Sequence, residues 1–110
     1  MRLQRFEKRI IFEQMKSLKQ IEKSLQEHKS SLFKKYPIKK MAIFGSYSRG
    51  DQNESSDIDI LVEFNGKIGL AFVDLAEEIE SLLGKHVDLV SKNGIKKKYF
   101  DSINSDLIYV

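Results

Sequence analysis

Two aspartates separated by a single residue, Asp57 and Asp59, are the first side chains in this sequence that could do chemistry together. Side chains two positions apart on a strand point to the same face, so these two carboxylates would lie side by side. Aspartate is uncommon in strands and rarely buried, so another group must offset the unfavourable charge of this pair. A third carboxylate, Asp88, interrupts the later apolar run 87–90. If the two strands are neighbours, three carboxylates converge.

Such a cluster predicts a divalent cation. At an effective dielectric constant of about 20, three converging charges repel one another by several kcal/mol, and a bound cation removes that cost. Carboxylate oxygens favour Mg²⁺ or Mn²⁺ over zinc, and the chain has no cysteine to supply thiolate ligands. Displacement at phosphorus uses two such ions, one to activate the attacking oxygen and one to hold the leaving phosphates.

Gly45 and Ser46 would supply the second half of such a site. They follow a predicted strand directly and begin a turn that opens a short helix, where main-chain N–H groups favour an anion. Gly45 has no Cβ, so the backbone can approach a phosphate closely, and the Ser46 hydroxyl adds a donor. Arg49 lies one helical turn further on and could reach a phosphate; the alternative is an exposed arginine without a partner.

The surrounding hydrophobic pattern predicts the elements that position these residues. A stripe at helical spacing runs from Leu3 to about Ser30, and Pro37 ends any helix before it. Alternation predicts a strand over 57–64, and short apolar runs predict further strands over 41–44, 87–90 and 107–110. A second helix is predicted from the apolar stripe Leu70, Val73, Ala76, Ile79 and Leu83, and it ends at Gly84. A short helix is predicted over 95–104. This order predicts an α/β or α+β domain with helices covering one face of its sheet.

Composition and charge narrow the class of protein. A chain of 110 residues makes one small domain. No apolar run is long enough to span a membrane, and the N-terminus lacks the apolar block of a signal peptide. We therefore expect a cytoplasmic protein without a membrane partner. Residues 1–40 carry twelve Lys or Arg and four Asp or Glu, a balance of +8, whereas residues 41–110 carry seven and twelve, a balance of −5. The basic arm is either a solvated helix face or a docking surface for an anionic partner.

The motif also carries a family resemblance. Gly45-Ser46, ten residues and then Asp57-Ile58-Asp59 resembles the signature of the DNA polymerase β-like nucleotidyltransferase superfamily. The segments KKYPIKKMAIFGSYSRGD and LLGKHVDLVSKNGIKKKYFDSINSDLIYV are similar to those of the minimal nucleotidyltransferases (MNT), antitoxins that are paired with HEPN-domain toxins. The resemblance covers residues 20–110 and leaves 1–19 as an N-terminal helical extension. It implies a small polymerase β-like fold, with a mixed sheet of about four strands and helices packed on one face.

The resemblance further implies an activity and the residues that perform it. Gly45 and Ser46 would bind the nucleotide phosphates. Asp57 and Asp59 would bind two Mg²⁺ ions, and Asp88 would complete the metal site and help to activate the acceptor hydroxyl. Members of this group transfer AMP from ATP to a tyrosine of the HEPN toxin and silence it, so we expect a protein adenylyltransferase.

Two other functions stay open from the sequence. The chain could be a binding module that neutralises its partner by complex formation alone, with inherited carboxylates. It could also be a nucleotidyltransferase that acts on a small molecule or an RNA end. Stable nucleic-acid binding is not expected, because the acidic body lacks the many Lys and Arg contacts that a phosphate backbone needs.

Overall fold

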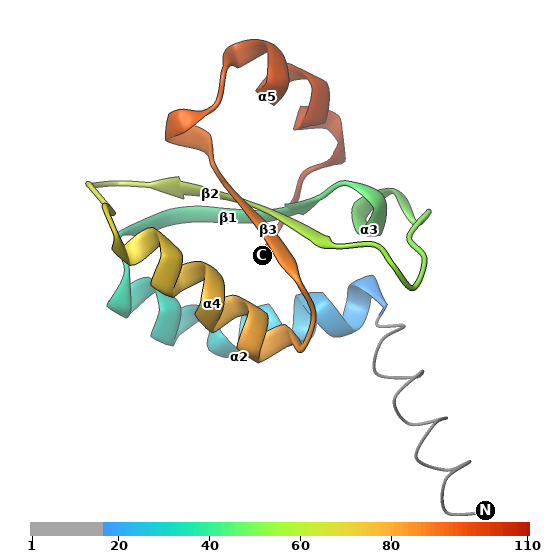
Figure 1. Ribbon diagram of the computed structural model, residues 1–110, viewed down its shortest axis with the longest axis horizontal. Helices are drawn as coiled ribbons and strands as arrows, with labels where there is room; N and C mark the ends of the chain where they lie inside the picture. The colour runs from blue at the N-terminus through green and yellow to red at the C-terminus, as the bar shows by residue number, and fades with distance from the viewer. Residues whose placement is uncertain (1–16) are drawn as a thin grey trace, which may run out of the picture.

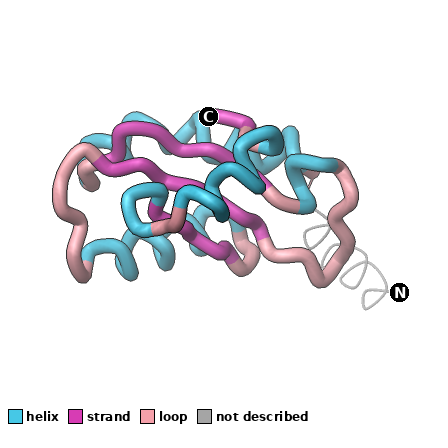
Figure 2. The backbone as a smooth tube through the Cα atoms, turned by 90° about the horizontal axis from the view of Figure 1, so that it is seen from above, coloured by secondary structure: helices cyan, strands magenta, loops and turns pink. Residues whose placement is uncertain are grey.

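The computed structural model describes residues 17–110. The beginning of the helical stripe at Leu3 and residues 1–16 of the expected N-terminal helical extension lie outside this range. Its ribbon is drawn in Figure 1 and its backbone, seen from above, in Figure 2. The elements, in chain order, are α2 (Leu18–Lys35), β1 (Ile38–Phe44), α3 (Ser46–Arg49), β2 (Ile58–Phe64), α4 (Ala71–Leu83), β3 (Val87–Ser91), the 3-10 turn η1 (Lys92–Gly94), α5 (Lys97–Ile103), the 3-10 turn η2 (Asn104–Asp106) and β4 (Ile108–Tyr109).

The four strands form one mixed sheet in the order β3-β2-β1-β4. β1 is antiparallel to both β2 and β4, whereas β2 and β3 run parallel and are joined through α4. Helices α2 and α4 cover one face, as predicted, and α5 lies over the other face (Figures 1 and 2). The predicted mixed sheet of about four strands is therefore confirmed, and α5 adds a helix to the second face.

The hydrophobic core lies between the sheet and the pair α2 and α4. Alternate residues of β2 point into it, because successive side chains of a strand face opposite sides. The fully buried residues include Ile21 and Leu25 of α2, Ile43 of β1, Ile58 and Ile60 of β2, and Leu75, Ile79 and Leu83 of α4. The odd-numbered residues of β2, among them Asp59, consequently face away from this core.

The predicted buried face of α4 is wrong in its first half. Leu70 precedes the helix and is 91% exposed, and Val73 is 55% exposed, whereas Leu75 is fully buried. At 3.6 residues per turn, Val73 and Leu75 lie about 200° apart around the helix. The stripe that packs on the sheet therefore runs from Leu75 through Ile79 to Leu83 at intervals of four residues, and its first member differs from the predicted one.

The ends of two other elements also differ from the prediction. β1 begins at Ile38, before the predicted Met41, and continues through two exposed lysines. Its register against β2 shifts between Ile38 and Lys40, as at a β-bulge. α2 begins after Ser17, whose hydroxyl forms a capping box with Gln20, and it continues to Lys35. The boundary expected between the N-terminal extension, residues 1–19, and the nucleotidyltransferase-like region, residues 20–110, falls in the first turn of this helix. Within residues 17–110, no helix has the length and apolarity needed to cross a membrane.

Candidate active site

Asp59 and Asp88 face the same side of the sheet. They are direct register partners on the parallel strands β2 and β3. Residues paired across neighbouring strands project to one face, and for this pair it is the face opposite α2 and α4, since Ile58 and Ile60 occupy the core side. The parallel crossover through α4 thus brings together two carboxylates that lie 29 residues apart in the sequence.

Asp57 lies just before β2 at the same end of the sheet. Its carboxylate is half exposed, and its Oδ2 lies 4.0 Å from Nε2 of His86. The Tyr47 ring is fully buried nearby; burial raises the pKa of its hydroxyl, and the charge of Asp57 raises it further. Tyr47 is therefore a packing residue of the core.

The electrostatics of Asp59 link the three carboxylates. Partial burial raises the pKa of Asp59 above its ordinary value, and the charges of Asp88 and then Asp57 raise it further. Among the described residues, Arg49 is the cation whose charge acts in the opposite sense on this pKa. The ionised form of Asp59 is thus disfavoured by burial and by two neighbouring carboxylates, and Arg49 offsets this only in part.

The chemistry of this donor set fits a hard divalent cation. All three side chains offer carboxylate oxygens, the ligands that Mg²⁺ prefers, and the repulsion around Asp59 would be relieved by positive charge. In the described part of the chain, no three acidic or histidine side chains are gathered closely enough to enclose an ion as they stand. Asp57, Asp59 and Asp88 are the residues that would hold it.

Gly45 connects β1 to α3 and packs against Asp59. Its φ of 75° lies in the region that L side chains rarely adopt. A Cβ built at this position would lie 2.9 Å from the carboxyl carbon of Asp59 and would overlap its Oδ2 atom. Only glycine therefore lets the turn that follows β1 approach the carboxylate cluster, which joins the two halves of the sequence motif in space.

Arg49 lies at the end of α3 and is engaged by two carboxylates. Its Nε donates to Asp51 at 3.2 Å and its Nη1 donates to Asp106 at 3.3 Å. Both carboxylates raise the pKa of the guanidinium, that of Asp51 most. The alternative of an arginine without a partner is therefore wrong, and its predicted contact with a phosphate stays a prediction.

A histidine and a glutamate beside the cluster were not predicted as site residues. Nδ1 of His86 lies 2.6 Å from Oε2 of Glu80, and the same oxygen accepts the Val87 N–H at 3.0 Å. Glu80 belongs to α4, so these two contacts fix the last turn of the helix to His86 and Val87, the two residues directly before Asp88. No sequence spacing marks the pair, because helix and strand meet only after the chain turns at Gly84.

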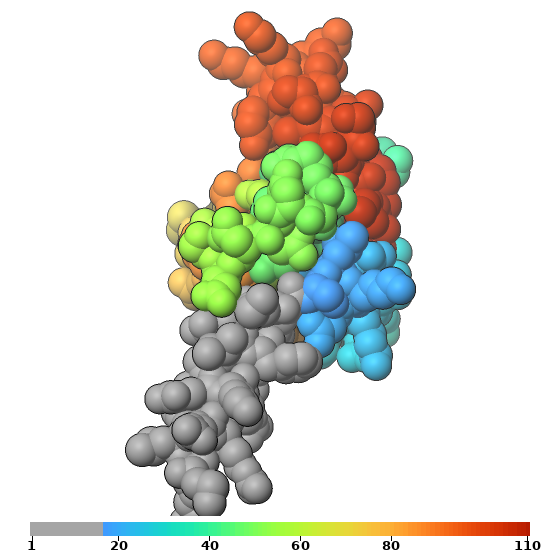
Figure 3. All heavy atoms as spheres, turned by 90° about the vertical axis from the view of Figure 1, so that its right-hand side faces the viewer, coloured from blue at the N-terminus to red at the C-terminus, as the bar shows by residue number. Residues whose placement is uncertain are grey.

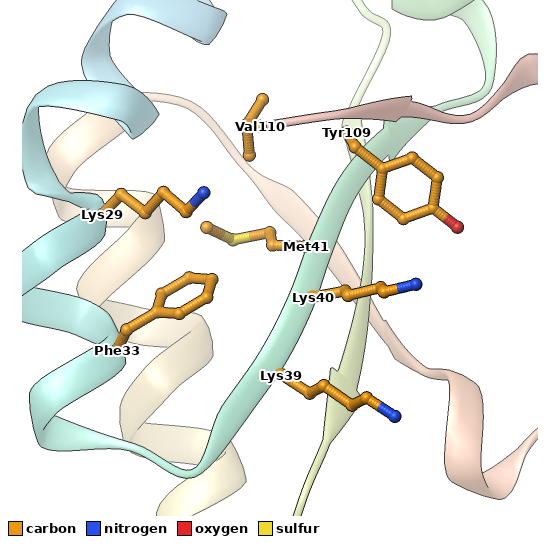
Figure 4. A pocket seen from close by; sticks show the side chains of 7 residues that line it. All are labelled: Lys29, Phe33, Lys39, Lys40, Met41, Tyr109 and Val110. Atoms are coloured by element: carbon orange, nitrogen blue, oxygen red, sulfur yellow. The ribbon is translucent and has the colours of Figure 1, made fainter.

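A separate groove of about 250 Å³ lies at the β4 edge of the sheet (Figure 4). β4 pairs with Ala42 and Ile43, and the Val110 N–H donates to the Met41 carbonyl, which leaves residues 38–40 of β1 at an open edge. Lysines on an open edge strand prevent it from pairing with strands of other molecules, which gives Lys39 and Lys40 in this groove a structural role. Its lining contains none of the predicted site residues and consists of Lys29, Phe33, Lys39, Lys40, Met41, Tyr109 and Val110.

A comparison with protein families matches residues 18–109 to the family described as nucleotidyltransferase domain. A curated relative, the protein adenylyltransferase MntA of Thermococcus cleftensis, is 39% identical over 97 residues, which cover 87% of this chain and 98% of the relative. The match spans every element from α2 to β4, so it includes both the glycine turn and the carboxylate cluster.

Solved structures share the fold. One described as a minimal nucleotidyltransferase superposes with a TM-score of 0.68 at 28% identity and covers 86% of this chain and 96% of its own. Another, a complex of a tri-AMPylated Shewanella oneidensis HEPN toxin with its MNT antitoxin, has a TM-score of 0.54 at 23% identity and covers 76% of this chain and 69% of its own. At 23% identity, the similarity to this second structure shows a shared fold only. Together with the family match, the comparisons confirm the resemblance drawn from the motif.

Proposed function

This chain belongs to the nucleotidyltransferase domain family, and we propose that it transfers AMP from ATP to a tyrosine hydroxyl of a partner HEPN toxin and thereby acts as the antitoxin. The relative MntA is named a protein adenylyltransferase, and a HEPN toxin that carries AMP groups forms a complex with an antitoxin of the same fold. The observation that carries the proposal is the pairing of Asp59 with Asp88 beside Gly45.

Each site residue has a role in this reaction. Gly45 and Ser46 bind the phosphates of ATP, and Arg49 adds a positive charge at the end of the same helix. Asp57, Asp59 and Asp88 would hold two Mg²⁺ ions, whose positive charge would offset the negative charge of the triphosphate and of the leaving pyrophosphate. Asp88 is exposed and the Asp57 carboxylate is half exposed, so an acceptor can approach the site.

The bond changes of the reaction are those of a single displacement. The tyrosine oxygen attacks the α-phosphorus of ATP, a new O–P bond forms, and the bond from this phosphorus to the bridging oxygen breaks so that pyrophosphate leaves. The hydroxyl proton is lost in the same step, and we assign its removal to Asp88, which is exposed on the site's face.

An acceptor held by a partner protein suits the charge of this body better than a nucleic acid does. Residues 41–110 carry seven basic and twelve acidic side chains, a balance of −5, and the carboxylate cluster lies within them. A phosphate backbone would be repelled there, because its binding needs many Lys and Arg contacts. A tyrosine presented by a protein brings no such charge.

Transfer of label from α-labelled ATP to a partner HEPN-domain protein tests the proposal. The wild-type protein with Mg²⁺ is expected to label the partner, and Asp57→Asn, Asp59→Asn and Asp88→Asn are each expected to reduce the rate at least about 100-fold. Asp101→Asn is the matched control, because Asp101 pairs with Lys97 on the exposed surface of α5. Unchanged labelling in all three site variants would reject the assignment.

The two alternatives give different results in the same system. A non-catalytic binding module predicts that a variant with both Asp57→Asn and Asp59→Asn still neutralises the partner in cells. A nucleotidyltransferase for another acceptor predicts label in a small molecule or an RNA end, and none in the partner protein.

A further inference from the structure

Asp106 contacts two consecutive residues of α3. Its main-chain carbonyl accepts a hydrogen bond from the Ser48 hydroxyl, and its carboxylate accepts one from Arg49 Nη1 at 3.3 Å. Asp106 belongs to η2, near the C-terminal end of the chain, so these contacts join segments that are more than 50 residues apart. Figure 3 shows the α3 region, in green, directly against the C-terminal segment, in red.

α3 depends on contacts from outside itself. It has four residues, and a single helical turn is unstable alone because nucleation of a helix costs more than one hydrogen bond returns. Its N-cap residue, Gly45, has no side chain to cap it, and Gly50 ends it in the left-handed conformation. The two bonds to Asp106 are therefore well placed to hold the position of the turn.

Of the two carboxylates on Arg49, that of Asp106 is the more shielded. Its side chain is 25% exposed, against 61% for Asp51. Asp51 also lies only two residues from Arg49 and moves with α3, whereas Asp106 belongs to a different segment. An ion pair in a more shielded setting is screened less by water and salt, so the Asp106 pair is the one that can fix α3 to the rest of the domain.

We propose that Asp106 is a positioning residue for the phosphate-binding turn: through Arg49 and Ser48 it fixes α3, and with it Gly45 and Ser46. The proposal rests on the proposed function only in that this turn binds ATP. It assigns a role to a carboxylate outside the metal cluster, and it gives the C-terminal segment a part in nucleotide binding.

Asp106→Asn is the test variant. Asparagine keeps the size of the side chain and the main-chain carbonyl that accepts from Ser48, so the variant removes only the charge that holds Arg49. We expect the dissociation constant for ATP, measured by calorimetry below the unfolding temperature, to rise about tenfold. We expect the amide hydrogens of α3 to exchange faster as well. Asp101→Asn is the matched control and should change neither quantity, because Asp101 pairs with Lys97 on α5.

A double-mutant cycle with Arg49→Gln tests whether Asp106 acts through Arg49. In the Arg49→Gln background, Asp106→Asn is expected to weaken ATP binding less than twofold further. An equal tenfold loss in both backgrounds, or unchanged affinity and unchanged α3 exchange in the single variant, would overturn the inference. If the wild-type protein bound no ATP, the proposed function would fail, and the exchange rates of α3 would still decide whether Asp106 holds it.

Discussion

Asp59 and Asp88 are paired in register on two parallel strands, and both carboxylates face the side of the sheet that α2 and α4 leave free. Asp57 adds a third charge close enough to raise the pKa of Asp59 further. A fold gains nothing from gathering like charges in this way. The arrangement costs stability in the protein alone, and such a cost at one site is typical of groups that are kept for binding or catalysis.

Replacing Asp59 by asparagine should therefore stabilise the protein in the absence of divalent cations. The pKa of Asp59 is raised by burial and by Asp88 and Asp57, so folding disfavours its ionised form. The gain in the free energy of unfolding should be small below the ordinary pKa of aspartate, about 3.9, where the carboxyl is mostly protonated in both states. It should grow as the pH rises from there to the raised pKa, and it should stay constant above that. Because the cluster is partly open to water, we expect about 1 kcal/mol at pH 7.

Denaturant unfolding in a chelating buffer at pH 3.5 and pH 7 measures this difference. Asp101→Asn serves as the control, since its carboxylate pairs with a lysine and its removal should bring no gain. A variant at Asp59 that is less stable than the wild type at pH 7 would contradict the electrostatic argument.

Gly45→Ala and Gly50→Ala form a matched pair of substitutions. Both glycines have positive φ, 75° and 80°, but a Cβ at Gly50 would meet nothing within 4 Å, whereas one at Gly45 overlaps the Asp59 carboxylate. We expect Gly50→Ala to cost about 1 kcal/mol of unfolding free energy, from backbone strain alone. Gly45→Ala should cost about 3 kcal/mol and abolish ATP binding. Equal costs in thermal or denaturant unfolding would show that the contact with Asp59 is unimportant.

Magnesium should stabilise the wild-type protein and leave the carboxylate variants unchanged. A ligand that binds only the folded state adds RT ln(1 + [L]/Kd), about 2.7 kcal/mol at 100 times its dissociation constant. Thermal unfolding with and without Mg²⁺ should therefore show an increase in Tm that chelation reverses. The increase should be absent in a variant with both Asp57→Asn and Asp59→Asn. An equal increase in this variant would place the ion elsewhere.

The buried face of α4 is tested by Leu75→Ala and Val73→Ala. Leu75 is fully buried and Val73 is 55% exposed, although the two lie only two positions apart. We expect Leu75→Ala to cost about 3 kcal/mol, from lost burial and the cavity that it leaves. Val73→Ala should stay within about 0.5 kcal/mol. Chemical denaturation measures both losses of unfolding free energy. A larger loss for Val73→Ala than for Leu75→Ala would support the buried face predicted from the sequence.

The motif residues were identifiable in the sequence because their relation is local. Gly45 and Ser46 follow directly on an apolar run, and Asp57 and Asp59 alternate with isoleucine, so strand geometry alone places the two carboxylates on one face. Periodicity was sufficient for the strands and for the existence of α2 and α4. It could not fix the buried face of α4, because two apolar stripes share Ile79 and Leu83, and only packing against the sheet selects between them.

The sequence by itself determined which functional groups are available: three carboxylates, a glycine turn and the elements that carry them. Only the tertiary structure decided which distant residues meet. The parallel crossover through α4 puts Asp88 opposite Asp59, the end of α4 brings Glu80 to His86, and the C-terminal segment brings Asp106 to Arg49. The physical reason is that local spacing sets the direction of a side chain, whereas strand order and register, which depend on the packing of the whole core, set its neighbours.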